Sequence, residues 1–152
     1  MKNRVFSLII VLLTTAFLIS CKKEKEEEPL SRKQILTAHA WKLGKVLFNG
    51  LEITDPTALA AIGAFSNNSF LFKSDGTYTA TDNTTGAVTT GTWELQENDS
   101  KLLIKSSSES YTFTVANLTQ DILSLTTPFT AGPPLIPLQI SGTAEIQLIP
   151  VK

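Results

Sequence analysis

The chain has 152 residues, of which 42% are hydrophobic, and this length fits one domain with a single core. Its 13 Lys and Arg against 14 Asp and Glu give a formal net charge of -1, which provides no basic surface for the phosphate backbone of nucleic acids. One Cys and one His cannot by themselves form a tetrahedral Cys/His zinc site, an intramolecular disulfide or a Cys-x-x-Cys redox pair. We therefore expect no metal, no cofactor and no nucleic-acid partner.

The first 20 residues have the pattern of a secretory signal peptide. Lys2 and Arg4 form a short basic segment, and residues 5–19 are then almost wholly apolar. This run lies at the upper limit of a signal peptide and is shorter than the ~20 residues that a membrane-spanning helix needs. We therefore predict that residues 1–20 are removed as a signal rather than retained as a membrane span.

The segment Leu-Ile-Ser-Cys at residues 18–21 resembles the lipobox of bacterial lipoproteins. A thiol is the nucleophile that can accept a diacylglycerol group, and the small Ser20 lets a peptidase reach the bond before Cys21. The resemblance implies cleavage between these two residues and acylation of Cys21 with diacylglycerol and palmitate-like chains, which would hold the protein on a membrane durably. The alternative is a plain secretory signal, or an uncleaved anchor, in which the Cys is incidental.

Directly after the cysteine, residues 22–28 are all charged (Lys-Lys-Glu-Lys-Glu-Glu-Glu), and Pro29 follows them. No packed core can contain such a run, so residues 21–29 are predicted to form a solvated tether. A Lys followed by acidic residues also resembles the surface-export signal of Bacteroidetes lipoproteins, although Lys25 interrupts the acidic run here. Lys22 is not the Asp that retains enterobacterial lipoproteins in the inner membrane. We expect attachment to the outer membrane, at either its periplasmic or its external face.

Two short helices are predicted before the strand-rich part of the chain. Ser31 and Gln34 have the spacing of a capping box, which predicts a helix from Ser31 to about Ala40. Asp55 can cap a second helix, in which the Ala-rich residues 58–65 follow a proline at the first helical position.

The remaining sequence predicts a series of short strands. Residues 41–48 suggest a first strand, broken at Gly44 and closed by the turn dipeptide at residues 49–50, and from residue 69 onward apolar and polar residues alternate with period two. The expected strand segments lie near residues 41–48, 69–72, 77–81, 88–96, 102–104, 111–115, 123–125 and 143–149, with a Pro-rich loop over residues 128–137. Seven or eight short strands joined by tight turns predict an all-β domain over residues 30–152, a small antiparallel meander barrel with a short N-terminal helix. Closure into a barrel removes the unpaired edges of the sheet.

Several of these segments resemble the lipocalin-like domain lipoproteins of Bacteroidetes. The resemblance rests on Trp41, on Phe-x-Phe-x-x-Asp-Gly-Thr-Tyr at residues 70–78, on Gly-Thr-Trp-Glu-Leu at residues 91–95 and on the alternating residues 111–125. It implies a lipocalin-like barrel with a calyx that can hold a small apolar ligand, and it carries information about the fold more than about the function. The Ala-rich segment and the Pro-rich loop depart from the family pattern, and either could cover or fill the mouth of the barrel.

The candidate site residues are aromatic rather than catalytic. His39 is the only histidine, and no nucleophile and base pair is recognisable, so no enzymatic activity and no catalytic residue are predicted. The aromatic residues either line a ligand cavity or simply fill the core, since an eight-stranded barrel has room for one or the other. The side chains expected to face a cavity are Phe72, Tyr78, Trp93 and Tyr111.

Two functions remain open at this point. The first is a membrane-anchored, non-catalytic binding or accessory module for a small apolar ligand. The second is a structural lipoprotein with a solid barrel that binds another envelope protein, through the Pro-rich loop or residues 58–65. An enclosed void lined by aromatic rings would favour the first, and a packed interior with an exposed apolar patch would favour the second.

Overall fold

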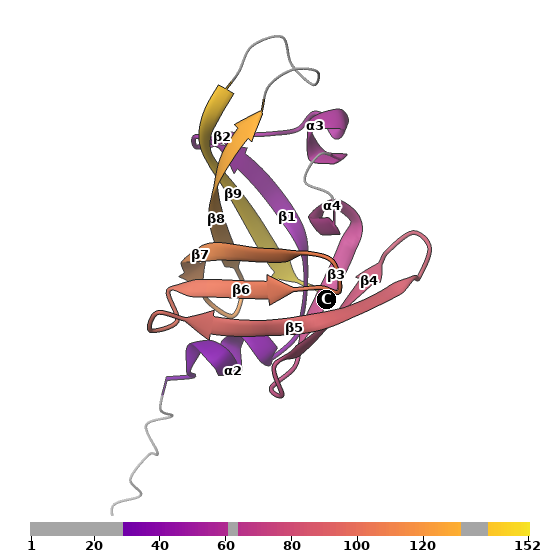
Figure 1. The fold of residues 1–152 in the computed structure, drawn as a ribbon, viewed down its shortest axis with the longest axis vertical. Helices are drawn as coiled ribbons and strands as arrows, with labels where there is room; N and C mark the ends of the chain where they lie inside the picture. The colour runs from indigo at the N-terminus through magenta and orange to yellow at the C-terminus, as the bar shows by residue number, and fades with distance from the viewer. Residues whose placement is uncertain (1–28, 61–63, 132–139) are drawn as a thin grey trace, which may run out of the picture.

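A computed structural model of the protein describes residues 29–60, 64–131 and 140–152 (Figure 1). The predicted signal peptide, Cys21 and nearly all of the charged tether lie outside the described residues. Within them, no helix is long and apolar enough to cross a membrane.

The fold is an antiparallel β-meander closed into a ring of eight strands. Strands follow each other in the order β1-β3-β4-β5-β6-β7-β8-β9, and a further pairing between β1 and β9 closes the ring. The strands are β1 (Ala40–Phe48), β3 (Asn68–Phe72), β4 (Thr77–Asp82), β5 (Val88–Gln96), β6 (Lys101–Lys105), β7 (Ser110–Leu118), β8 (Leu123–Ala131) and β9 (Ile140–Pro150). A ninth strand of two residues, β2 (Leu51–Glu52), pairs only with β1. The predicted all-β meander barrel is confirmed.

Strand β1 closes the barrel against β9 without the break predicted at Gly44. The register runs from Trp41 opposite Pro150 to Phe48 opposite Ala144, and it shifts by one residue at Gly44. A Cβ atom at Gly44 would lie 3.0 Å from Cγ2 of Ile149. The glycine therefore forms a β-bulge that bends the strand and does not end it.

Helix α2 (Arg32–Thr37) covers one end of the barrel (Figure 1). The predicted capping box is present: the Ser31 hydroxyl accepts a hydrogen bond from the Gln34 backbone N–H, and the Gln34 side chain accepts one from the Ser31 N–H. The helix ends at Thr37 and not near Ala40, because Ala40 already pairs with Leu71 of β3. Pairing within the closed sheet therefore sets the end of the helix.

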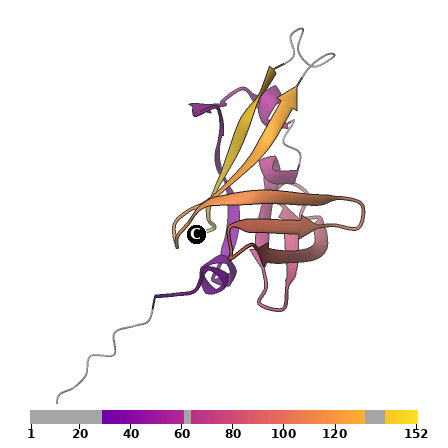
Figure 2. The same ribbon diagram turned by 60° about the vertical axis from the view of Figure 1, so that its left-hand side comes forward.

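Two very short helices lie towards the other end of the barrel, α3 (Pro56–Ala60) and α4 (Ala64–Asn67) (Figures 1 and 2). The helix predicted over residues 58–65 is described only at its two ends, by α3 and α4, because residues 61–63 lie outside the described residues. Asp55 acts as expected, since its carboxylate accepts a hydrogen bond of 2.9 Å from the Ala58 backbone N–H.

Strands β8 and β9 extend further than predicted. Strand β8 continues through Pro128 to Ala131 and pairs with β9 along its whole length, whereas its last pair with β7 is at Thr126. One edge of β8 is open beyond that residue, and proline is tolerated at such an edge. The described part of the predicted loop over residues 128–137 is therefore strand, and the rest of that loop lies outside the described residues.

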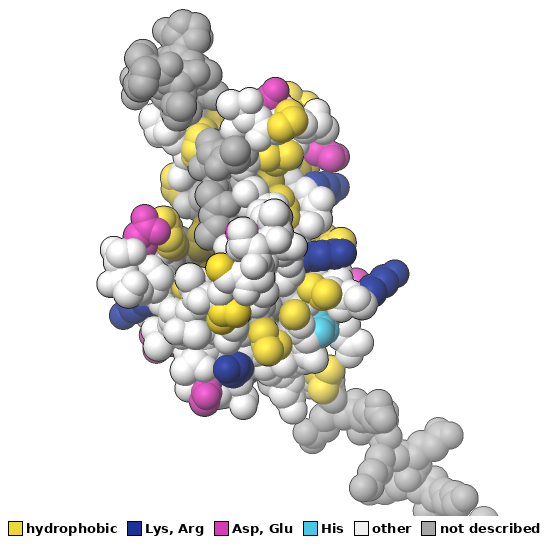
Figure 3. All heavy atoms as spheres, turned by 90° about the vertical axis from the view of Figure 1, so that its right-hand side faces the viewer, with side chains coloured by type: hydrophobic (Ala, Val, Ile, Leu, Met, Phe, Trp, Pro, Cys, Tyr) yellow, Lys and Arg dark blue, Asp and Glu magenta, His cyan; other side chains and the backbone are white. Residues whose placement is uncertain are grey.

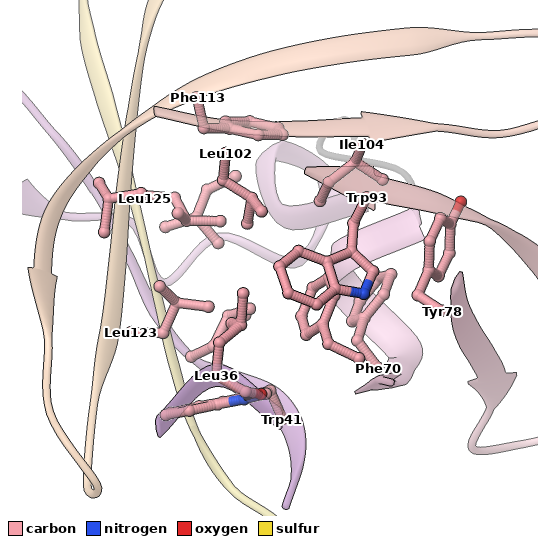
Figure 4. Close-up of a cluster of buried hydrophobic side chains, with 14 of the residues drawn as sticks. Leu36, Trp41, Phe70, Tyr78, Trp93, Leu102, Ile104, Phe113, Leu123 and Leu125 are labelled. Carbon is pink, nitrogen blue, oxygen red and sulfur yellow. Dashed lines mark hydrogen bonds between the residues drawn. The ribbon is translucent and has the colours of Figure 1, made fainter. Parts of the chain in front are cut away.

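The hydrophobic core fills the inside of the ring and is closed below by α2. Alternate residues of each strand face inwards, and Figure 4 shows side chains of β1 and β3 to β8 converging with Leu36 of α2. The largest fully buried side chains are Trp41, Phe72, Leu36, Leu102, Leu123, Leu125 and Leu148.

Candidate functional site: the aromatic network of the barrel

Among the described residues, seven aromatic side chains of the barrel form one continuous network of ring contacts, and the buried Trp41 lies outside it. Strands β3, β4 and β5 supply its centre, where the ring of Phe72 lies 5.7 Å from Trp93 in an edge-to-face arrangement and 6.2 Å from Tyr78. The ring of Phe70 lies 6.5 Å from Phe72 and 6.4 Å from Tyr78. These separations are the favoured ones for aromatic pairs. Three of the four predicted ligand-facing residues therefore lie in one buried cluster.

Both tryptophans use their indole N–H groups within the protein. Trp93 donates from Nε1 to the backbone oxygens of Lys73 (3.0 Å) and Thr77 (2.9 Å), at the base of the β3–β4 hairpin. Trp41 donates from Nε1 to the backbone oxygen of Leu36 (2.9 Å) and so ties β1 to α2. Neither group is free to bind a ligand, and both rings act as parts of the core.

Tyr78 lies inside the barrel because Gly91 leaves room for its ring. The two residues are opposite each other in the β4–β5 ladder, and a Cβ atom at Gly91 would lie 2.5 Å from Cε1 of Tyr78. Tyr78 is only 6% exposed, and burial raises the pKa of its phenol. Gly91, which lies opposite Tyr78 and has no side chain, therefore lets the sheet accommodate this large ring at the margin of the core.

Tyr111 occupies the rim of the network and not its centre. It is opposite Ile104 in the β6–β7 ladder and therefore faces inwards, yet it is 48% exposed. Its ring stacks 6.3 Å from the buried Phe113. A hydrogen bond to the Glu109 carboxylate raises the pKa of Tyr111. At this rim the barrel therefore presents an aromatic face beside a carboxylate.

Phe65 of α4 joins the rim to the centre. Its ring lies 5.5 Å from Phe113, edge to face, and 5.0 Å from Phe70, and it is 9% exposed. Phe65 was expected only as part of an apolar helical segment, because nothing in a single sequence shows that a residue on a separate helix fills the space between β3 and β7. The aromatic network thus runs from the exposed Tyr111 through Phe113, Phe65 and Phe70 to the core.

The β4–β5 hairpin holds α4 in place. The side-chain amide of Asn67, the last residue of α4, donates hydrogen bonds to Thr84 Oγ1 (2.8 Å) and Asp82 Oδ1 (3.3 Å). Backbone N–H bonds from Thr85 and Thr84 to the Asp82 carboxylate hold its pKa below the ordinary value. The aspartate is therefore a turn-stabilising residue that also positions the helix carrying Phe65.

Polar groups elsewhere form no recognisable chemical site. The His39 ring lies tilted against Trp41 with ring centroids 4.3 Å apart, and its Nε2 is buried with no hydrogen-bond partner among the described residues. On the outer face, the Glu145 carboxylate accepts hydrogen bonds from Gln147 (2.7 Å) and from Ser124, and these lower its pKa. The described part of the chain contains no group of three or more His, Cys, Asp and Glu that could hold a metal ion.

One depression lies on the outer surface of β5 and β6. It encloses about 260 Å³ and is open to solvent. Its walls are Thr92, Trp93, Glu94, Leu103 and Lys105. Since the Trp93 ring points into the core, this surface offers only polar groups and one leucine, which does not suit an apolar ligand.

Sequence comparison places the chain in a family. A family model described as "Lipocalin-like domain" matches residues 39–125, which include β1 and the strands that carry most of the aromatic network. The chain belongs to the lipocalin-like domain family. The predicted resemblance is therefore confirmed for the domain.

Among solved structures, the chain is similar to a DUF4847 family protein from Bacteroides vulgatus. The two share 15% sequence identity with a TM-score of 0.46, and the match covers 78% of this chain and 96% of the other. No curated protein matches the sequence.

Proposed function

We propose that this protein is a lipid-anchored, non-catalytic binding module of the bacterial cell envelope, whose lipocalin-like domain takes a small apolar ligand at the end carrying α4. Anchoring would be through the acylated thiol of Cys21, and outer-membrane attachment follows from the residues after it. The family to which the domain belongs supports a binding role, because a lipocalin-like barrel is typically a binding fold and not a catalytic one.

The observation that carries the ligand proposal is the aromatic network between the surface and the core. Tyr111 is half exposed, and its ring stacks on Phe113. Phe113 in turn contacts the ring of Phe65. Phe65 lies on the short helix α4, whose last residue, Asn67, is held by hydrogen bonds to the β4–β5 hairpin, so displacement of the Phe65 ring has only a side chain to move. An apolar ligand with a flat ring would replace Phe65 between Phe70 and Phe113, close to the half-exposed ring of Tyr111.

Substitution of Phe65 tests this proposal. The Phe65→Ala variant should bind naphthalene more tightly than the wild type, because the ligand no longer has to displace a side chain. Quenching of Trp93 fluorescence and titration calorimetry would measure the affinity. Phe129→Ala is the matched control, since Phe129 contacts Phe48 outside the network. Absence of binding in both wild type and Phe65→Ala would contradict the ligand proposal.

A second function is favoured by the packing of the interior. The described aromatic side chains contact each other closely, as in a solid core, which suits a structural lipoprotein that binds another envelope protein. Native mass spectrometry of the protein purified from its own host separates the two. A bound small molecule supports the ligand module, and a bound polypeptide supports the structural role.

The anchor needs its own test. Cells that express the wild type or Cys21→Ala would be grown with a labelled fatty acid. We expect label in the wild type alone, and equal labelling of both would contradict the anchor. Protease treatment of intact cells would then distinguish the external face of the outer membrane from the periplasmic face.

A further inference from the structure

Three aliphatic side chains are exposed together on the outer face of the barrel near the end covered by α2. Leu71 of β3 is 39% exposed, Ile149 of β9 is 38% exposed and Val151 is 40% exposed. Leu71 lies between the inward-facing Phe70 and Phe72, and Ile149 follows the fully buried Leu148, so both point outwards. We call these three residues the aliphatic patch.

Strand pairing makes the aliphatic patch continuous. Leu71 is opposite Ala40 in the β1–β3 ladder, and the Val151 backbone N–H donates to the Ala40 oxygen at 2.9 Å. Ile149 is opposite Lys42 on the other edge of β1. The patch thus spans β3, β1 and the end of β9. Figure 3 shows one face of the molecule, on which hydrophobic side chains are scattered over the upper and lower halves, with Lys, Arg, Asp and Glu side chains among them.

The segment that runs from Pro29 through β1, beside the aliphatic patch, is basic, although the protein as a whole is not. Residues 29–152 contain 8 Lys and Arg, that is 13 less the 5 in residues 1–28. Four of these 8 lie in residues 29–51, which contain no Asp or Glu: Arg32, Lys33, Lys42 and Lys45. Lys33 and Lys42 are exposed and take part in no ion pair among the described residues. Lys45 interacts electrostatically with Glu145, and Nε and Nη2 of Arg32 are buried.

The patch also lies at the end of the domain where the predicted tether attaches. Helix α2 begins at Arg32, three residues after Pro29, and covers that end (Figure 1). The 8 residues from Cys21 to Glu28 span at most about 30 Å when fully extended. An acylated Cys21 would therefore hold the α2 end close to the lipid headgroups.

We infer that the aliphatic patch and the lysines beside it dock on the anionic headgroup surface of the bilayer that carries the anchor. Exposed aliphatic side chains beside exposed lysines, here Lys33 and Lys42, are a combination that favours interfacial membrane binding. The inference rests on the proposed anchoring at Cys21 and adds an orientation to it. Docking through this face leaves α4 and the rim at Tyr111 directed away from the lipid, so that ligand entry stays open.

Lysine footprinting on vesicles tests the docking. The chain of residues 21–152 would be coupled through Cys21, its only cysteine, to a maleimide-bearing lipid, and mass spectrometry would follow acetylation of Lys42 and Lys105. Lys105 is the matched control: it is also an exposed strand lysine, and β6 lies four strands from β1 in either direction around the ring. On phosphatidylglycerol-rich vesicles, acetylation of Lys42 should slow about fivefold relative to Lys105. On phosphatidylcholine vesicles the ratio should be unchanged.

Matched variants show whether the aliphatic patch itself takes part. Leu71→Gln should restore acetylation of Lys42 on anionic vesicles, whereas Val88→Gln, at a 60% exposed position on β5, should not. If acetylation of Lys42 relative to Lys105 were the same on both kinds of vesicle, the docking would be overturned and a protein partner for the patch would be favoured. Because the coupling supplies the anchor chemically, that result would leave the fatty-acid labelling test of Cys21 unaffected.

Discussion

Tyr78 and Gly91 depend on each other across the β4–β5 ladder. The phenol ring occupies the space in which any other residue at position 91 would place its Cβ atom. The same Cβ atom would also collide with the backbone oxygen of Lys105 on β6, which cannot move without breaking the ladder. The glycine is therefore required by the packing around it and not by its own backbone angles.

Replacing this glycine should destabilise the fold strongly. We expect Gly91→Ala to lower the free energy of unfolding by about 3 kcal/mol, at the upper end of the usual cost of overpacking a core. Urea denaturation followed by tryptophan fluorescence would measure the change. Thr90→Ala, at an exposed neighbouring position, should change stability by less than about 0.5 kcal/mol. Similar values for the two variants would show that Tyr78 can move aside.

The lowered pKa of Asp82 predicts that the stability of the fold depends on pH. This pKa is lowered in the folded protein by the backbone N–H groups of Thr85 and Thr84, so the carboxylate stabilises the fold above its ordinary pKa. This contribution is lost as the pH falls below about 4, through the lowered pKa of the folded state. Asp82→Asn, which can still accept hydrogen bonds but does not titrate, should lose less stability between neutral pH and about pH 3.

Denaturation midpoints at the two pH values would measure this difference. Asp75 and Glu145 also have lowered pKa values, so part of the stability loss at low pH should persist in Asp82→Asn. An identical acid loss in wild type and Asp82→Asn would mean that the turn is insensitive to this charge.

At the scale of elements, α2 is stable only because of what it covers. A helix of six residues is too short to form alone in water, even with a complete capping box. Leu36 is fully buried among core side chains, and its backbone oxygen accepts the hydrogen bond from Trp41. The helix therefore belongs to the barrel as its end cover.

Truncation of Leu36 should show this dependence. We expect Leu36→Ala to lower the free energy of unfolding by about 3 kcal/mol, because it leaves a cavity where α2 meets the core. Leu30→Ala, at a 46% exposed position next to the same helix, should cost less than about 0.5 kcal/mol. Thermal unfolding followed by near-ultraviolet circular dichroism would measure both. Equal effects would mean that α2 is held by its cap and not by burial.

For the whole molecule, closure of the ring depends on pairing between residues about one hundred positions apart. Trp41 is opposite Pro150, and β9 also pairs with β8 along its whole length. Without β9, two strands would lose a neighbour and the core would open on one side. Such distant pairing also makes folding slow compared with that of helical domains.

Removal of β9 should abolish the fold. A chain that ends at residue 139 is expected to lose the near-ultraviolet signal of its tryptophans, whereas removal of residues 151–152 alone should retain it. Circular dichroism of both truncated chains would decide the matter. A native-like spectrum for the shorter chain would show that the other seven strands form an independent sheet.

Local patterns in the sequence determined which elements form, because turns and alternation depend on neighbouring residues. Asp75-Gly76 and Asn49-Gly50 lie at turns with positive φ at both glycines, and the capping box at Ser31 begins α2 as predicted. The ends of elements were predicted less well. Helix α2 ends early and β8 continues through Pro128, because each boundary is set by pairing with a distant strand.

Only the tertiary structure decided how the aromatic residues divide between core and surface. Alternation correctly placed Phe72, Tyr78 and Trp93 on the inner face, but it could not show that Tyr111 lies at a rim or that Phe65 fills the space beside Phe113. Which strands are neighbours, and where the ring ends, depend on closure between β1 and β9. The number of strands and the cost of open edges predicted that the sheet closes, but which residues of β1 and β9 pair is a property of the whole chain that short-range patterns do not show.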